Sequence, residues 1–201
     1  MSQATEIESR IVAAGARLAA AGPWQQVLLR DVAADAGLPL ADVFAVIPST
    51  SDLVARILAD GDRQMLHDYD PDPTDVSVRD RLFDAVMTRF EVCEPQRAAL
   101  TSIWHAVRRD PLQMLALRRS LLRTADALVV AVWGDASGLA GLARTRAVAV
   151  LWLDCLQVWV DDQPGELAKT MAHLDQRLRL AEEWLPRCRP GGRSAAAEGL
   201  S

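Results

Sequence analysis

The pattern of apolar and polar positions over the first 70 residues predicts three short helices followed by a longer one. In the first of them the apolar residues recur three or four positions apart, which is the spacing of an amphipathic helix. Gly22-Pro23 ends this helix, Gly37 is a natural left-handed C-cap for the second, and Pro48 ends the third. Ser49 and Asp52 supply an N-cap and a first-turn acid for the fourth. The four predicted helices cover residues 5–21, 29–36, 40–47 and about 50–69.

The remainder of the chain predicts five further helices and no strands. The segment 70–75 reads DPDPTD, whose prolines remove amide donors and whose acids favour turns, so we place a boundary there. The later helical patterns cover residues 78–93, 96–109, 112–133, 139–160 and 166–186. The sequence therefore predicts an all-α protein of about nine helices. Its predicted parts are a head over residues 1–69 that includes the long fourth helix, a body over 76–187, and a disordered tail over 188–201.

Composition limits the classes of protein that this chain can be. Half of the residues are hydrophobic, which excludes a disordered chain and indicates additional burial in an oligomer. The chain has 22 Lys and Arg against 27 Asp and Glu, a formal net charge of −5. The whole molecule is therefore not attracted to a phosphate backbone, and any DNA contact must be local.

Cysteine usage and apolar runs indicate a cytoplasmic protein. Cys93, Cys155 and Cys188 form no CxxC or Cys/His ligand pattern, so we expect neither a disulfide framework nor a metal site. The N-terminal segment lacks the basic start and apolar centre of a signal peptide, and no apolar run approaches the roughly 20 residues that span a bilayer. We expect no cofactor and no stable membrane insertion.

The second and third predicted helices, separated by a turn at Gly37, have the layout of a helix-turn-helix, whose second helix can lie in the DNA major groove. Residues 29–38 read LRDVAADAGL, and ADVF at 41–44 and IPSTSDL at 47–53 follow. These segments resemble the TetR family of transcriptional regulators over about 50 residues, in the same order and spacing. The resemblance implies a recognition helix within the head and a body that binds a ligand and dimerises. It also implies a homodimer in which the last two helices, about 139–160 and 166–186, pair with their mates.

The predicted recognition helix departs from the family pattern, which has small and basic residues at its start. Residues 39–47 read PLADVFAVI, and no positive side chain lies between Asp31 and Ala55. This helix offers none of the Arg, Lys, Asn or Gln side chains that commonly read base edges. Phosphate contacts would have to come from basic and hydroxyl residues around it. The candidate DNA contacts are Arg10, Arg17, Arg30, Leu40, Ala41, Asp42, Phe44, Ser49 and Thr50.

The C-terminal third carries a second resemblance. The segments 123–126, 134–137, 159–162 and 170–178 are similar, in register over about 60 residues, to lipid-binding accessory proteins of ubiquinone biosynthesis. Those proteins keep the TetR fold without a DNA-binding role. Their membrane-touching amphipathic helix has no counterpart in the Pro190-Gly191-Gly192 segment. This resemblance implies lipid or isoprenoid binding without delivery to a membrane.

Large apolar side chains on the body helices are spaced so that they could line one shared cavity for an apolar small molecule or a lipid. For each of them, an ordinary place in the core is the alternative. The candidates are Phe83, Met87, Phe90, Trp104, His105, Leu121, Leu128, Trp152, Cys155 and Trp159. Of these, His105 could be a polar handle inside the cavity, or a hydrogen-bonded core or surface residue.

The sequence contains no motif of an enzyme: it has no HExxH spacing, no Gly-x-Ser-x-Gly and no glycine-rich phosphate loop. Asp161 and Asp162 read as the solvated end of a helix. Two functions therefore stay open, and an enzyme on the same scaffold is a distant third. One is a ligand-responsive, homodimeric DNA-binding regulator, expected to act as a repressor. The other is a protein of the same fold that binds a lipid or another small molecule and has lost DNA binding.

Overall fold

The computed structural model describes residues 3–70, 77–163 and 165–184. Within these ranges the chain forms nine α-helices and two short 3-10 turns, and no strand. The all-α fold predicted from the sequence is confirmed. The elements are α1 (Gln3–Ala21), η1 (Trp24–Gln26), α2 (Leu29–Ala36), α3 (Leu40–Val46), α4 (Thr50–Asp68), α5 (Val78–Cys93), η2 (Glu94–Gln96), α6 (Arg97–Val107), α7 (Pro111–Trp133), α8 (Gly138–Asp161) and α9 (Ala168–Trp184).

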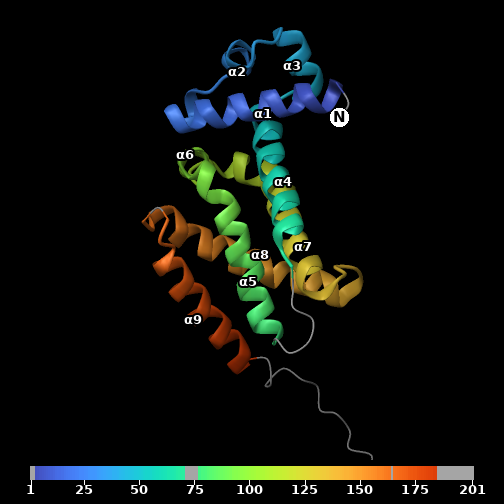
Figure 1. The fold of residues 1–201 in the computed structure, drawn as a ribbon, viewed down its shortest axis with the longest axis vertical. Helices are drawn as coiled ribbons and strands as arrows, with labels where there is room; N and C mark the ends of the chain where they lie inside the picture. The colour runs from blue at the N-terminus through green and yellow to red at the C-terminus, as the bar shows by residue number, and fades with distance from the viewer. Residues whose placement is uncertain (1–2, 71–76, 164, 185–201) are drawn as a thin grey trace, which may run out of the picture.

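Helices α1, α2 and α3 form a small head at one end of the long helix α4 (Figure 1). The first turn of α4 is capped by Ser49, whose Oγ accepts from the Asp52 backbone N–H at 3.1 Å. The turn between α2 and α3 contains Gly37 at φ 64°, the left-handed conformation that a glycine C-cap supplies. Both caps were predicted from the sequence and are confirmed.

The body consists of α5 to α9 (Figure 1). Helices α5 and α7 pack on α4, α8 packs on α7, and α9 packs on α5 and α8. The centre of the body core is an aromatic stack. Phe90 lies 4.5 Å from Trp152 and 5.7 Å from Trp159, measured between ring centroids. All three side chains are buried, and each contributes roughly 1.5–3 kcal/mol or more by leaving water.

The core of the head extends into body helices. Ile11, Val32 and Leu53 of the head pack in one cluster with residues of α6 and with Leu117 of α7. The Oγ of Ser102 on α6 accepts from the Trp24 backbone N–H at 3.0 Å and donates to the Gly22 carbonyl at 2.9 Å. The predicted ranges 1–69 and 76–187 therefore share a hydrophobic core, and the division into two domains stays a prediction.

The connection between α8 and α9 differs from the prediction. The last helix begins at Ala168 instead of residue 166, because Gly165 and Leu167 both have positive φ. Asp161 is exposed, but Asp162 is buried, which corrects our expectation of a solvated pair. The Asp162 carboxylate accepts from the backbone N–H and the hydroxyl of Thr170, both at 2.9 Å, and so satisfies the first turn of α9.

The predicted tail over residues 188–201, with Cys188, and the final two residues of the predicted helix 166–186 lie outside the described residues. Among the helices that are described, none is by itself long and apolar enough to cross a membrane. Only the bent pair of α7 and α8 taken together meets that length and composition.

Candidate functional site

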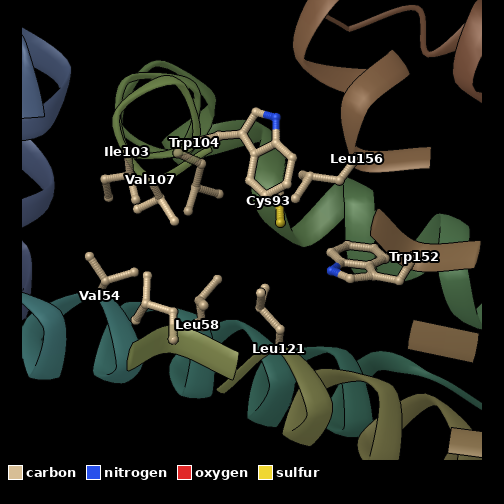
Figure 2. Close-up of a pocket in the computed structure, with 11 residues that line it drawn as sticks. Val54, Leu58, Cys93, Ile103, Trp104, Val107, Leu121, Trp152 and Leu156 are labelled. Carbon is tan, nitrogen blue, oxygen red and sulfur yellow. The ribbon is translucent and has the colours of Figure 1, made fainter. Parts of the chain in front are cut away.

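An apolar cavity lies where the head meets the body (Figure 2). Helices α4, α5, α6, α7 and α8 each contribute to its wall. Its lining residues are Val54, Leu58, Cys93, Leu100, Ile103, Trp104, Val107, Leu117, Leu121, Trp152 and Leu156. None of these side chains carries a charge. The cavity volume is about 40 Å³, which is room for roughly three water molecules and far below the size of a ligand pocket. A ligand can enter only if the surrounding helices move apart.

The structure brings three of the predicted pocket residues to this cavity, namely Trp104, Leu121 and Trp152. Most of the others lie in the body core or against it: Phe83, Met87, Phe90, Leu128, Cys155 and Trp159. Their spacing therefore indicates which helix faces are buried. It does not show that Phe90 and Trp159 stack on each other in the body core instead of lining the cavity.

The sequence reasoning missed the contribution of α4 to the cavity. Val54 and Leu58 face it from the head side, opposite Ile103 and Val107 of α6 (Figure 2). The four-residue spacing of Val54 and Leu58 on one helix face was visible in the sequence. The predicted head includes the whole of α4, so the sequence leads us to expect the cavity within the body alone.

Two buried nitrogen atoms near the cavity have no hydrogen-bond partner among the described residues: Nε1 of Trp104 and Nδ1 of His105. Figure 2 shows the indole nitrogen of Trp104 on the side of the ring away from the cavity. His105, which the sequence suggested as a polar handle, is not among the residues that line the cavity.

A buried charged cluster lies beside the cavity and joins α4, α5 and α7. Nε of Arg89 donates to Asp62 at 3.0 Å, and the hydroxyl of Thr124 donates to the second Asp62 oxygen at 3.1 Å. Arg89 also donates to the Leu58 carbonyl at 3.1 Å and to Sγ of Cys93 at 2.8 Å. Burial raises the pKa of the Asp62 carboxyl although Arg89 acts against it, and burial raises the pKa of the Cys93 thiol.

On the head, two of the three basic candidates for DNA contact have partners within the molecule. Nη2 of Arg10 donates to the Ala36 carbonyl at 2.6 Å, and so satisfies the C-terminal end of α2. Arg17 donates to the Asp35 carboxylate, with an Nη2–Oδ2 distance of 2.6 Å. Arg30 is exposed, and its one partner among the described residues is Asp31, in a loose pair at 3.6 Å. A phosphate would have to compete with the partners of Arg10 and Arg17.

The surface around α3 is apolar and acidic. Leu40 is 49% exposed and Phe44 is 59% exposed, and together with Leu28, Leu29, Ala41 and the cation Arg30 they line a shallow, mostly apolar depression. Asp42 is exposed on the same helix. The hydroxyl of Ser49 is engaged in the cap of α4, and Thr50 is half-buried.

The head also carries the net negative charge of the chain. Residues 1–70 contain five Arg and no Lys against ten Asp and Glu, while the remainder of the sequence is balanced. This charge opposes approach to a phosphate backbone.

Substitution of Arg10 by alanine is expected to lower the free energy of unfolding by about 1 kcal/mol. The partially exposed bond from Arg10 to the Ala36 carbonyl would be lost. Urea denaturation followed by circular dichroism measures this loss. Arg30→Ala is the matched control and is expected to change stability by less than about 0.5 kcal/mol, because Arg30 is exposed and only loosely paired. Equal stability of both variants would contradict the capping role of Arg10.

The described residues contain no group of three or more His, Cys, Asp or Glu side chains placed to hold a metal ion. The features of the candidate site are a helix-turn-helix-like head, a helical body and an apolar cavity between them.

No protein-family model and no curated protein matches this sequence.

Solved structures do match the fold. A TetR transcriptional regulator from Nitrosomonas europaea aligns with a TM-score of 0.68 at 19% identity, over 89% of this chain and 99% of that one. A TetR transcriptional regulator from Rhodococcus sp. RHA1 aligns with a TM-score of 0.68 at 14% identity, over 89% and 97%. A structure from Mesorhizobium loti, described as of the TetR family, gives 0.52 at 12% identity, over 90% and 96%. The chain therefore has the fold of TetR transcriptional regulators, as the sequence resemblance predicted.

Proposed function

We propose that this chain is a ligand-responsive regulator in which an apolar small molecule enters the cavity and repositions the head. The observation that carries this proposal is the composition of the cavity wall. Val54, Ile103, Val107 and Leu117 line the cavity and also belong to the core of the head. A ligand that enlarges the cavity must therefore displace side chains on which the head is packed.

The path from the cavity to the head runs through α6. Ile103 and Val107 face the cavity, and Ser102 on the same helix holds Gly22 and Trp24 by hydrogen bonds. A displacement of α6 by the ligand would be passed directly to the end of α1. The ligand would favour whichever head position accompanies the larger cavity, in proportion to its difference in affinity for the two states.

We place the homodimer interface on α8 and α9, as the sequence resemblance implied. Both helices leave apolar side chains in water, and the area that they expose favours pairing with a second copy. On α8, Leu139 is 87% exposed and Val150 is 70% exposed, and Met171 and Leu180 are exposed on α9. In such a dimer a change of head position alters the separation of two helix-turn-helix units, which must match half-sites about one helical turn apart.

The test is a binding assay on DNA from the gene's own promoter region at low salt, with native mass spectrometry of the purified protein. Organic extraction of any bound molecule supplies the ligand for the assay. A dimer that binds the promoter specifically and releases it when the apolar ligand is added would support the regulator. If the dimer co-purifies with a lipid or quinone and does not bind DNA at low salt, the regulator is excluded.

A second function is favoured by the surface of the head. The engagement of Arg10 and Arg17 within the molecule, and the excess of acids over residues 1–70, both oppose DNA binding. These observations support a protein of TetR fold that binds a lipid or another small molecule and has no DNA-binding role. The same assay separates the two functions.

Substitution of Asp42 by lysine is expected to raise non-specific DNA affinity if the head binds DNA weakly. The change removes an exposed acid from α3 and adds one phosphate contact, which steepens the slope of log affinity against log salt by roughly one. Fluorescence anisotropy on a labelled duplex at several salt concentrations measures both quantities. Asp161→Lys, an equal change of charge at an exposed position of α8, is the control. An equal response in the two variants would count against groove contact by α3.

A further inference from the structure

A second cavity lies next to the first, between α4, α5 and η2. Its volume is about 230 Å³, and its lining residues are Ile57, Asp60, Gly61, Gln64, Arg89, Val92, Cys93, Pro95, Gln96 and Leu100. Cys93 and Leu100 line both cavities, and among the lining residues they form the wall between the two. A rotation of the Leu100 side chain is a small change compared with the helix movement that a ligand in the first cavity requires.

The two cavities have different chemistry. The wall of the first is apolar, whereas the second is lined in part by the charged and amide residues Arg89, Asp60, Gln64 and Gln96. A guanidinium has five N–H donors. Arg89 uses three of them, one each on Asp62, Cys93 and Leu58, within the part of the chain that the structure describes. Arg89 therefore lines the second cavity as a nearly buried donor with N–H groups that no described residue engages.

We infer that the two cavities form one binding site for an elongated amphiphile, with its apolar body in the first cavity and a neutral, hydrogen-bond-accepting end beside Arg89 in the second. This inference rests on the proposed function, because it takes the first cavity to be the ligand site. It adds the chemical class of the ligand, which is a long-chain ketone, ester, amide or alcohol.

The charges around the second cavity favour a ligand whose polar end is neutral. Arg89 already has a carboxylate partner in Asp62 at 3.0 Å, and Asp60 also lines the cavity. A carboxylate ligand would meet two acids and would have only a guanidinium whose charge is already balanced. A cationic end would meet Arg89 itself. A carbonyl or hydroxyl oxygen can accept an N–H without adding a charge to a buried site.

Gly61 allows the position of Arg89 to be tested without removing the charge. A Cβ placed on Gly61 would lie 2.6 Å from Nη1 and 2.8 Å from Cζ of Arg89, so the guanidinium must shift in Gly61→Ala. Alanine is the better helix former by about 1 kcal/mol, which offsets part of the cost of moving Arg89, and Gly61 lies inside α4. Circular dichroism and urea denaturation check that the variant is folded before its binding is measured. Gly22→Ala is the matched control, because a Cβ there meets nothing within 4 Å.

The experiment compares three nine-carbon probes on the full chain: nonan-2-one, nonane and nonanoate. Headspace partitioning measures binding of the two volatile probes, and calorimetry at pH 7.5 measures nonanoate. Nonane is the more hydrophobic probe, so the readout is the ratio of nonan-2-one affinity to nonane affinity in each variant. We expect this ratio to be about five- to tenfold higher in the wild type than in Gly61→Ala, the effect of one hydrogen bond from a buried donor, and we expect nonan-2-one to bind more tightly than nonanoate. The affinity for nonane itself should be unchanged in Gly61→Ala, and Gly22→Ala should behave as the wild type.

The outcomes separate this inference from the proposed function. A ratio of nonan-2-one to nonane affinity that is the same in Gly61→Ala and in the wild type overturns the inference alone, because the apolar cavity still binds ligand. Tighter binding of nonanoate than of the ketone overturns the inference that the polar end of the ligand is neutral. Absence of binding by all three probes overturns the inference and the proposed ligand cavity together. A ketone preference that persists in Gly61→Ala excludes Arg89 as the donor.

Discussion

Replacement of Asp62 by alanine is expected to lower the free energy of unfolding by about 3–5 kcal/mol, since it leaves the guanidinium of Arg89 buried without its counter-charge. Arg89 is 2% exposed, and Asp62 is its only carboxylate partner among the described residues. Thr124 loses its acceptor in the same change. Urea denaturation followed by circular dichroism measures the loss. Asp60→Ala is the control on the same helix, and it should cost less than about 1 kcal/mol because its partner Arg63 is exposed.

The double variant Asp62→Leu with Arg89→Met distinguishes an unpaired charge from a loss of packing. With both charges removed, most of the stability lost in Asp62→Ala is expected to return, because a buried ion pair contributes little beyond an apolar pair of similar volume. If the double variant is as unstable as Asp62→Ala, the cost comes from packing and our explanation is wrong.

Replacement of Trp159 by alanine is expected to cost about 3–5 kcal/mol, the range for removing a large aromatic side chain from a core. Trp159 is fully buried and stacks on Phe90, and its indole N–H donates to Glu94 at 2.8 Å. The guanidinium of Arg97 lies 4.3 Å from the centroid of its ring. Urea denaturation and the near-ultraviolet circular dichroism of the aromatic core measure the effect.

Two further variants separate the contributions of Trp159. Trp159→Phe keeps a ring against Phe90 and loses the bond to Glu94, so we expect a smaller cost of about 1–2 kcal/mol. Trp133→Ala is the control for removal of an indole that is only half-buried, beside Arg144. If Trp159→Ala costs no more than Trp133→Ala, the aromatic stack is not the centre of the body core.

The helices were predictable because the chain contains strong local signals for them. Residues 29–36 and 78–93 were predicted with the bounds that the structure has, since glycine, proline or a capping serine lies next to their ends. The start of α9 was not predictable. It depends on the positive φ of Leu167 and on the reach of Asp162 to Thr170, eight positions away.

The site was harder to predict than the fold because it depends on contacts between distant segments. Spacing shows which face of a helix is buried but not which other helix covers it. Trp104 and Trp152 line the cavity, for example, whereas Phe90, which stacks on Trp152, does not. The three basic residues of the head are equally visible in the sequence. Only the structure shows that the Ala36 carbonyl and Asp35 engage Arg10 and Arg17.

The shared core between the head and α6 also bears on how this protein could be recombined with others. Without Ile103, Val107 and Leu117 the apolar face of the head would be open to water, so residues 1–69 do not contain a complete hydrophobic core. A chimera that exchanges the head of this chain for that of a relative must carry α6 and the first turns of α7 with it. The unit that we expect to be exchangeable is thus discontinuous in sequence, because a single cut near residue 70 would leave Ile103, Val107 and Leu117 behind.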